Sequence, residues 1–404
     1  MTALAIFTIT YIGVALGRIP GLVIDRVGIA LLGAIAMVVF GVVTPEEAVQ
    51  SIDLPTILLL YALMVVSAQL RLGGFYTWAA SRIIFLLRRP RWFLLTSMVM
   101  SALLSSILAN DIVCFAFTPV LAISVLHANL NPLPFLIGLA VSSNIGSAAT
   151  IIGNPQNMLI GQIGKLDFAE FLFWCGPPAI IALIGSYLVI LLIYRKKFHR
   201  QGNPQTVEPP EKMPTFNRWQ TIKGIMVTGI LMVLFFTPVP REISAVGIAG
   251  ILLCSRRMKT RDILGLVDWH LITLFCALFV VIHAVSLGNY PQLVVTYLAE
   301  RGIDLHNLLM LTGISTVLSN VFSNVPATML LVRFLDAANP AEWFILAVSS
   351  TFAGNLIIIG SIANLIVIEQ AANHGIRITF RQHAAVGLPV TLVSLGVLII
   401  WMFI

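Results

Sequence analysis

Charged side chains are scarce in this sequence of 404 residues: Asp, Glu, Lys and Arg together make up 10% of it, whereas 58% is hydrophobic. The mean hydropathy of +0.97 excludes an ordinary water-soluble domain, in which about 25% of the residues are charged. Uncharged stretches are present instead at 27–43, 172–194, 224–240 and 384–404. Each is close to the roughly 20 residues that cross a bilayer as a helix. The composition therefore predicts an all-α polytopic membrane protein.

Several chemical signatures are also missing. The four cysteines, Cys114, Cys175, Cys254 and Cys276, stand singly in apolar stretches, without the CxxC spacing of metal or redox sites. Neither the HExxH metalloprotease motif nor the GxxxxGK[ST] phosphate loop occurs. We therefore expect no enzyme, no cofactor beyond Na⁺ or H⁺ as a coupling ion, and no ATP hydrolysis by this chain. The net charge of +7 is expected to reflect membrane topology and not nucleic-acid binding.

One block of sequence occurs twice. LAVSSNIGSAATIIGNPQN at 139–157 and LAVSSTFAGNLIIIGSIAN at 346–364 share nine identical positions. DLPTILLLYALMVV from Asp53 likewise matches DWHLITLFCALFVV from Asp268, and LSSILAND from Leu104 matches LSNVFSNV from Leu318. These pairs predict a first repeat at 1–194, a linker at 195–219 and a second repeat at 220–404. Polar, glycine-rich interruptions at matching places in two repeats point to a transport site near the bilayer midplane.

Basic residues gather in short loops at 88–91, 195–200, 256–261 and 377–381. The positive-inside rule places all of them at the cytoplasm. This is satisfied if both termini lie outside, the linker is cytoplasmic and the repeats have opposite orientations. We expect about ten spans, including broken helices at about 133–162 and 341–372, and re-entrant hairpins at about 92–126 and 307–338. The other spans are predicted near 3–19, 27–43, 54–72, 172–194, 220–240, 243–255, 268–288 and 384–404.

Asn110 and Asp111 interrupt the apolar sequence of the first predicted hairpin. An ionised carboxylate is costly inside a membrane, so Asp111 is a functional candidate. The structural alternative is that Asp111 only caps a helix beginning at Ile112, where a carboxylate suits the free N–H groups. The two interpretations are compatible.

The matching tip in the second repeat, Ser323 and Asn324, has no acid. Pro326 is expected in the first turn of the returning helix, where its missing N–H costs nothing. Asn110 and Asn324 can offer carbonyl oxygens to a cation or N–H groups to an anion, and the sequence leaves both open. Interhelical hydrogen bonding is the structural alternative for either residue.

Helix breakers lie in both copies of the repeated block, at Gly146, Gly153 and Pro155 and again at Gly354 and Gly360. Unwound backbone at membrane depth is tolerated only where it lines a cavity or is buried in protein. The hydroxyls and amides beside the breaks are therefore candidate ligands for substrate or coupling ion: Ser143, Asn144, Asn154, Asn157, Ser350, Thr351, Asn355, Ser361 and Asn364. The alternative is a helix-packing face of small residues, which explains GSAA but not GNPQN.

Three smaller expectations concern a possible ion site, a cysteine and a glutamate. A sodium site is proposed from the oxygens of Asn110, Asp111, Asn144 and Asn157. Cys114 lies one turn after Asp111, which suggests a thiol ligand for arsenic, but packing is the commoner role of a lone membrane cysteine. Glu369 is followed by His374 and Arg377 and is expected to pair at the cytoplasmic surface and not to bind ions.

At these motifs the chain resembles the ion transporter superfamily, which includes arsenite permeases, NhaD-type sodium/proton antiporters, citrate transporters and divalent-anion/sodium symporters. ILANDIVCFAFTPVL and SNVFSNVPATMLL resemble the two hairpins of arsenite permeases. SNIGSAATIIGNPQNMLIG and AGNLIIIGSIANLIVIEQA are more similar to the NhaD and citrate-type members. The resemblance covers nearly the whole chain. It implies that two hairpins and two broken helices enclose substrate and ions and that one part moves like an elevator, and it favours a homodimer over a monomer.

The hairpin tips depart from one branch of that superfamily. Dicarboxylate symporters carry Ser-Asn-Thr at both tips, whereas this chain has Ala-Asn-Asp at 109–111 and Ser-Asn-Val at 323–325. The added carboxylate would repel a carboxylate substrate and suits a cation or a proton. In its protonated form it could also donate to an oxyanion or to a neutral hydroxide such as arsenite. We therefore expect a secondary transporter of a small anion or oxyanion, arsenite-like or carboxylate, with an NhaD-type sodium/proton antiporter as the alternative. An arsenite pump would also imply a separate ATPase subunit.

Overall fold

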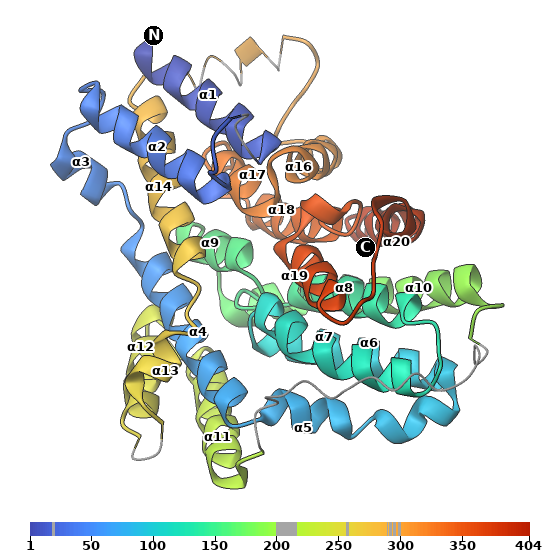
Figure 1. Cartoon of the computed structure of the whole chain (residues 1–404). Coiled ribbons are helices and arrows are strands. Elements are labelled where there is room, and N and C mark those ends of the chain that lie inside the picture. The colour runs from blue at the N-terminus through green and yellow to red at the C-terminus, as the bar shows by residue number, and fades with distance from the viewer. Residues whose placement is uncertain are drawn as a thin grey trace.

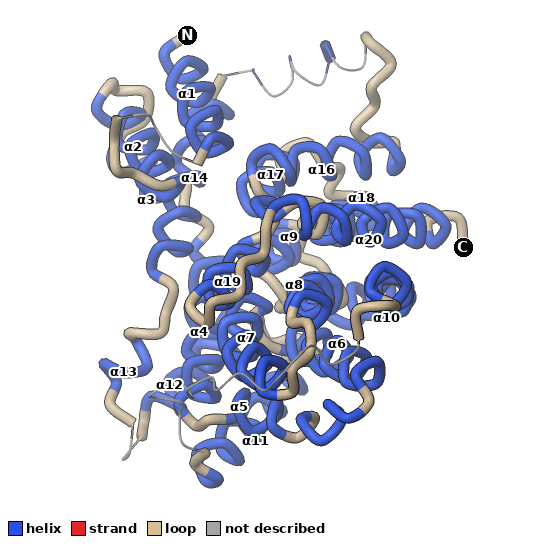
Figure 2. Tube along the Cα trace, turned by 45° about the vertical axis from the view of Figure 1, so that its right-hand side comes forward, coloured by secondary structure: helices blue, strands red, loops and turns tan. Residues whose placement is uncertain are grey.

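The computed structural model describes residues 1–17, 21–198, 216–255, 258–288, 290, 293, 296–297 and 300–404. Within these ranges every regular element is a helix (Figure 2), which confirms the predicted all-α class. By length and composition, five of the described helices are able to cross a membrane: Leu54–Leu72, Asn110–His127, Phe168–Tyr194, Trp269–Ser286 and Phe380–Trp401. Most of the predicted linker, at 199–215, and the basic residues Arg200, Arg256 and Arg257 lie outside the described residues.

Helices of the first half occupy the predicted spans and add short elements between them. They are α1 (Thr2–Leu16), α2 (Arg26–Val39), α3 (Pro45–Gln50), α4 (Leu54–Leu72), α5 (Phe75–Ser81), η1 (Ile84–Arg88), α6 (Pro90–Ile107), α7 (Asn110–His127), α8 (Leu133–Ser147), α9 (Pro155–Ile163) and α10 (Phe168–Tyr194).

The second half presents a closely similar order of helices. They are α11 (Arg218–Leu234), α12 (Arg241–Leu253), α13 (Thr260–Leu264), α14 (Trp269–Ser286), α16 (Leu308–Phe322), α17 (Asn324–Leu331), α18 (Pro340–Ala353), η2 (Ile358–Gly360), α19 (Ile362–Ala372) and α20 (Phe380–Trp401).

The two halves exchange their first helices. The α1 and α2 pair packs on α14 of the second half, whereas α11 and α12 pack on α4 of the first (Figure 1). The helices α6–α10 and α16–α20 form a second group, in which α6 packs on α8, α16 on α18 and α10 on α20. In this group the residues of α8 are buried from Pro134 to Ser147, so the first repeated block lies in the interior of the molecule.

Side-chain caps at matching positions explain why several helices begin where they do. Asp53 Oδ1 accepts a hydrogen bond from Thr56 N at 2.9 Å before α4, and Asp268 Oδ1 accepts one from Leu271 N at 3.0 Å before α14. Each carboxylate satisfies one of the free N–H groups at its helix start. The duplicated aspartate is therefore a duplicated helix-start signal.

Four short elements were not predicted. For α3 the signal was present in the sequence, because Thr44 and Glu47 form a capping box in which each side chain accepts from the other's backbone N–H. The helix α5 follows Gly74, whose φ of 75° suits glycine. It packs on α7, where the rings of Tyr76 and Phe117 meet edge to face. The elements η1 and α13 are too short for hydrophobic periodicity to reveal them.

Candidate functional site

The first tip is the junction between α6 and α7, and it is fixed to the break after α8. The backbone N–H of Asn110 donates to the carbonyl oxygen of Gly153 at 3.0 Å. Its Nδ2 donates to Asn144 Oδ1 at 3.1 Å, and the Ser143 hydroxyl donates to the Asn110 carbonyl oxygen at 3.2 Å. The remaining polar atom, Asn110 Oδ1, is buried and has no partner among the described residues, so it is free to accept a hydrogen bond or to contact a cation.

Asp111 lies beside Asn110 in the first turn of α7 and is half-buried. The idea that it caps a helix beginning at Ile112 is wrong, because α7 already begins at Asn110 and its N-cap, Ala109, makes no side-chain cap bond. A carboxylate in a first helical turn still interacts favourably with the positive end of the helix dipole. The carboxyl group of Asp111 is therefore available to a ligand while the helix end stabilises its charge.

Asn144 in α8 is the centre of a network of carboxamides from both halves. Its Oδ1 accepts from Asn110 Nδ2 and from the Ser361 hydroxyl, the latter at 2.9 Å. Its Nδ2 donates to Asn355 Oδ1 at 2.9 Å and to Asn364 Oδ1 at 3.2 Å. The side chain uses the full hydrogen-bonding capacity of an amide, and its partners come from α7, from the break after α18 and from α19.

A second connection between the halves runs from the block at 139–157 to α18. Asn154 Nδ2 donates to the Thr351 hydroxyl at 3.2 Å, and Thr351 Oγ1 lies 3.5 Å from Asn157 Oδ1. Asn154 Oδ1 also caps α9 by accepting from Asn157 N at 2.8 Å. The motif GNPQN thus forms a capped helix start, and its two asparagines face the other half of the chain.

The second tip, at Ser323 and Asn324, contacts the break between α18 and α19. Ser323 has a φ of 75° although it is not glycine, which marks a sharp and strained junction. The neighbours of Asn324 assign its amide orientation: the nitrogen donates to the carbonyl oxygens of Gly360 (2.8 Å) and Ser350 (3.1 Å), and the oxygen accepts from Gln156 Nε2 (3.3 Å). Pro326 lies in the first turn of α17, as predicted.

The two tips face one small cavity of about 20 Å³. It is lined by both tips and by the first residues of α9 and α19, namely Asn110, Asp111, Pro155, Gln156, Ser323, Asn324, Val325, Ser361 and Ile362. This volume has room for about one water molecule and not for a molecule as large as citrate. The cavity is thus the place where residues of both halves and a carboxylate converge.

The predicted candidates divide into two layers around this cavity. Five of them line it: Asn110, Asp111, Ser323, Asn324 and Ser361. The others form the hydrogen-bonded layer behind it: Ser143, Asn144, Asn154, Asn157, Ser350, Thr351, Asn355 and Asn364. Of the four residues in the predicted sodium site, Asn144 and Asn157 are thus in the second layer. That sodium site stays a prediction.

Gln156 was not predicted, although it lines the cavity and donates to Thr351 Oγ1 at 3.4 Å. Its position inside GNPQN was the available signal. Cys114 is buried in α7 and is not among the residues that line the cavity. Close helix packing, the structural alternative for the small residues of the repeated block, explains Gly146. A Cβ there would lie 2.3 Å from the Cα and the carbonyl oxygen of Ala102 in α6.

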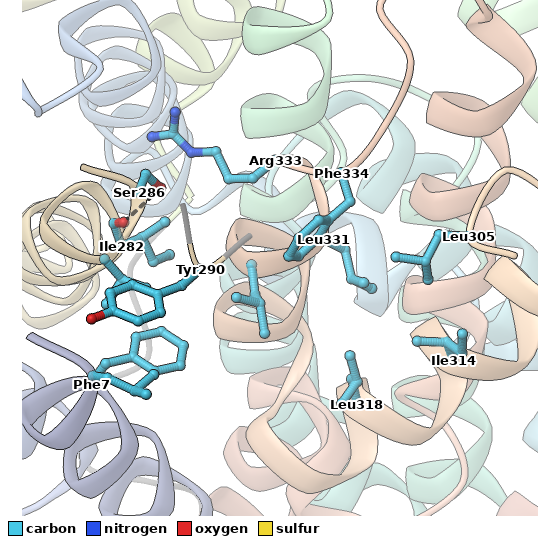
Figure 3. Close-up of a pocket in the computed structure, with 13 residues that line it drawn as sticks. Phe7, Ile282, Ser286, Tyr290, Leu305, Ile314, Leu318, Leu331, Arg333 and Phe334 are labelled. Atoms are coloured by element: carbon cyan, nitrogen blue, oxygen red, sulfur yellow. Dashed lines mark hydrogen bonds between the residues drawn. The ribbon is translucent and has the colours of Figure 1, made fainter. Parts of the chain in front are cut away.

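A separate apolar cavity lies between α1, α14 and the α16–α17 pair (Figure 3). Phe7, Ile282, Leu318 and Leu331 contribute to its wall, and the Arg333 side chain lies at the rim beside Phe334. A wall of this kind has little to offer a charged or polar solute, which needs polar groups to fix it. It does leave the α16–α17 pair incompletely packed on the helices that surround it.

Comparison with known proteins finds a transporter family and relatives that are named as transporters. The family described as citrate transporter matches residues 4–353. A silicon efflux transporter of Oryza sativa subsp. japonica is 29% identical over 93% of this chain and 92% of its own. A transporter named arsB of Dictyostelium discoideum is 25% identical over 91% and 85%, and the inner membrane protein YbiR of Escherichia coli is 28% identical over 87% and 89%.

Proposed function

Because the chain belongs to the citrate transporter family, we propose that it is a secondary active transporter for a small anion or oxyanion, driven by a proton or sodium gradient. The family and the relatives confirm the resemblance to the ion transporter superfamily and make the chain an integral membrane transporter. The observation that carries the proposal is the cavity at which Asn110 and Asp111 of one half meet Ser323 and Asn324 of the other. A site built from corresponding parts of two repeats suits alternating access.

We place the termini outside and the linker in the cytoplasm, with α6–α7 and α16–α17 as re-entrant hairpins of inverted repeats. In this proposal the group formed by α6–α10 and α16–α20 moves against α1, α2, α4, α11, α12 and α14. The incompletely packed apolar cavity between α1, α14 and α16–α17 supports such a sliding surface (Figure 3). A homodimer formed through the stationary helices is part of the same proposal.

The free groups at the cavity favour a substrate that donates hydrogen bonds. Asn110 Oδ1 is unpaired and Asp111 lies next to it, whereas Asn110 Nδ2 is already bonded to Asn144. An oxyacid bearing O–H groups, such as arsenite or a silicon oxyacid, would donate to these oxygens. Relatives named as a silicon efflux transporter and as arsB support this class. All of these solutes are larger than the single water molecule that the cavity can hold, so transport of any of them requires the cavity to widen, and citrate requires the most.

Asp111 is the coupling group in this proposal, because it is the acidic residue among those that line the cavity. Uptake or release of a proton at its carboxyl would change both its charge and its ability to donate a hydrogen bond. The second tip has Val325 at the equivalent place and cannot take part in that exchange. Proton coupling is therefore assigned to the first repeat.

The experiment is flux into proteoliposomes under an imposed pH or sodium gradient. Arsenite, silicic acid, phosphate, sulfate, citrate and succinate are offered in turn while internal pH is followed. We expect a pH change that requires one oxyacid and that disappears in Asp111→Asn. A matched control is Asp262→Asn, which alters an exposed acid in the first turn of α13. No movement of any solute would overturn the proposal, and an unchanged pH profile in Asp111→Asn would remove Asp111 as the coupling group.

The second candidate is a sodium/proton antiporter. It is favoured by the same juxtaposition of the Asp111 carboxyl and the unpaired Asn110 Oδ1, since oxygen ligands suit Na⁺. The same flux measurement separates the two functions. A pH change that needs only Na⁺ or Li⁺, with none of the anions present, would establish antiport.

A further inference from the structure

The C-terminal end of α9 is tied to the beginning of α12 by two hydrogen bonds. Arg241 Nη2 donates to the carbonyl oxygen of Gly161 at 2.8 Å, and Gln162 Nε2 donates to Glu242 Oε2 at 3.1 Å. The Gly161 oxygen also accepts from Leu166 N at 3.1 Å. A guanidinium that donates to one of the last carbonyls of a helix complements the negative end of the dipole. This junction joins the group of helices that we propose to move with the group that we propose to be stationary.

The duplicated sequence contains the parts of a second junction of this kind. Arg26 is the first residue of α2, as Arg241 is of α12. The repeated blocks align α19 with α9, since α9 begins at Pro155 and α19 at Ile362, which match in the two blocks. Continued from there, the alignment places Ile368 and Glu369 where Gly161 and Gln162 stand.

This second junction is open in the structure. Among the described residues, no hydrogen bond or ion pair involves the side chain of Arg26 or of Glu369, and Glu369 is exposed. The expected pairing of Glu369 at the surface is thus not made within the described part of the chain. The helix α2 packs on α1 and α14, whereas α19 packs on α7 and α8. The junction between α9 and α12 is thus closed, whereas its counterpart between α19 and α2 is open.

The distribution of acids also fits a pair of alternating junctions. In the closed junction the acid, Glu242, lies on α12 and meets Gln162 of α9. In the open one the position of Glu242 is taken by Val27, and the acid, Glu369, lies on α19 instead. Each junction thus has one arginine and one acid. In the predicted topology α12 begins on the outer side of the membrane and α2 begins on the cytoplasmic side. The two junctions would therefore lie on opposite faces of the membrane.

We propose that Arg26 and Glu369 form the closing contact of the opposite transport state. In that state the Arg26 guanidinium donates to the carbonyl oxygen of Ile368 and pairs with the Glu369 carboxylate, while Arg241 leaves Gly161. The reasoning is that two inverted repeats exchange conformations when the accessible side changes. The inference therefore rests on the proposed alternating-access function, and it names the residues that hold its second state.

Disulfide trapping in the full-length protein tests this directly. Starting from a variant in which the four native cysteines are replaced by serine, one pair is Arg26→Cys with Glu369→Cys and the control pair is Gln162→Cys with Arg241→Cys. Both are oxidised with copper phenanthroline in proteoliposomes. We expect both pairs to cross-link, since each belongs to one of two interconverting states. Formation of the control cross-link without any at 26 and 369 would overturn the inference.

A charge variant gives an independent reading. With the control pair as reporter, Arg26→Gln removes a contact of the opposite state and is expected to raise the cross-linking rate by about two- to fivefold, the worth of an exposed ion pair. Arg377→Gln removes an exposed arginine near the end of α19 and is expected to leave the rate unchanged. Equal effects of the two variants would contradict the pairing of Arg26 with Glu369.

These readings do not depend on knowing the substrate. If both cross-links form but no solute moves in the flux assay, the proposed function fails and the two-state contact stands. If a solute is transported but the pair at 26 and 369 never cross-links, the inference fails and the proposed function stands.

Discussion

Asn157 and Asn364 hold the two helix breaks in the same way. Asn157 Nδ2 donates to the carbonyl oxygens of Ser147 (3.2 Å) and Thr150 (3.0 Å), and Asn364 Nδ2 donates to those of Gly354 (2.8 Å) and Ile357 (3.3 Å). These carbonyls occupy matching positions in the repeated blocks. The oxygens of Thr150 and Ile357 also accept from the N–H groups of Gly153 and Gly360. The asparagine supplies the donor for the other oxygen of each pair, at Ser147 or Gly354, which lipid could not satisfy.

The substitutions Asn157→Asp and Asn364→Asp should therefore destabilise the protein by similar amounts. Each substitution removes the amide donor and places a carboxyl group next to two buried carbonyl oxygens. Buried groups left without a hydrogen bond lower the free energy of unfolding by about 1–3 kcal/mol. The measurement is thermal unfolding in detergent. Asn373→Asp, at the exposed end of α19, is the control and should unfold like the wild type. An unchanged unfolding temperature of either buried variant would show that its asparagine does not stabilise the helix break.

Asn144→Asp should abolish transport, and its effect on stability should be smaller. The new carboxylate oxygen would face Asn355 Oδ1 and Asn364 Oδ1, which now accept from Asn144 Nδ2, so attraction between the halves becomes repulsion. Flux and unfolding temperature are measured on the same preparation. Asn129→Asp, in the turn after α7, provides a control outside this network. Wild-type flux in Asn144→Asp would contradict the proposal that transport depends on the hydrogen bonds of Asn144 between the two halves.

Gly146→Ala should disrupt the packing of α6 on α8. The added Cβ would lie 2.3 Å from backbone atoms of Ala102, which cannot rotate away, and overpacking of this kind costs about 1–3 kcal/mol. Gly313→Ala is the matched control, because a Cβ there meets nothing within 4 Å. The two variants are compared by yield of folded protein after size-exclusion chromatography and by unfolding temperature. Equal behaviour would show that the helices are further apart than described.

Tyr11→Phe should change transport rate with little change in folding. The Tyr11 hydroxyl donates to the Pro326 carbonyl oxygen at 3.2 Å and so connects α1 to the second tip. The loss of one such bond is worth about 0.5–1.5 kcal/mol, which corresponds to about a two- to tenfold shift between states. The control is Phe173→Leu, which alters an exposed ring of α10 outside this contact and should leave the rate unchanged. Initial flux rates are the measurement.

The sequence predicted the positions of the main helices well, because their signals are local. The duplicated aspartates Asp53 and Asp268 are helix caps, and GNPQN marks the start of α9 through the side chain of Asn154. Hydrophobic periodicity and caps are both read within a few residues. The predicted second hairpin reached to 338, however, whereas α17 ends at Leu331, since no proline or glycine marks that end.

The partners within the site could not be predicted in the same way. Asn110 and Asn144 were both candidates, but their hydrogen bond depends on how α7 packs on α8, and contacts between α8 and α19 depend on the two halves coming together. A single sequence records which residues are polar at a break and not which oxygen each amide will meet. For this reason Gln156 was overlooked, and the layer behind the cavity could not be separated from its lining.

The exchange of first helices between the halves has a consequence for biosynthesis. The α2 helix leaves the ribosome early, yet the helix on which it packs, α14, is made only after α4 to α12. Until then α1 and α2 sit in the membrane without their partner, and the same is true of α4 until α11 and α12 arrive. Assembly is therefore a late, whole-chain event, and a chain that stops in the linker would lack the surface that its first helices need. Translocation machinery or lipid must shelter these helices in the interval.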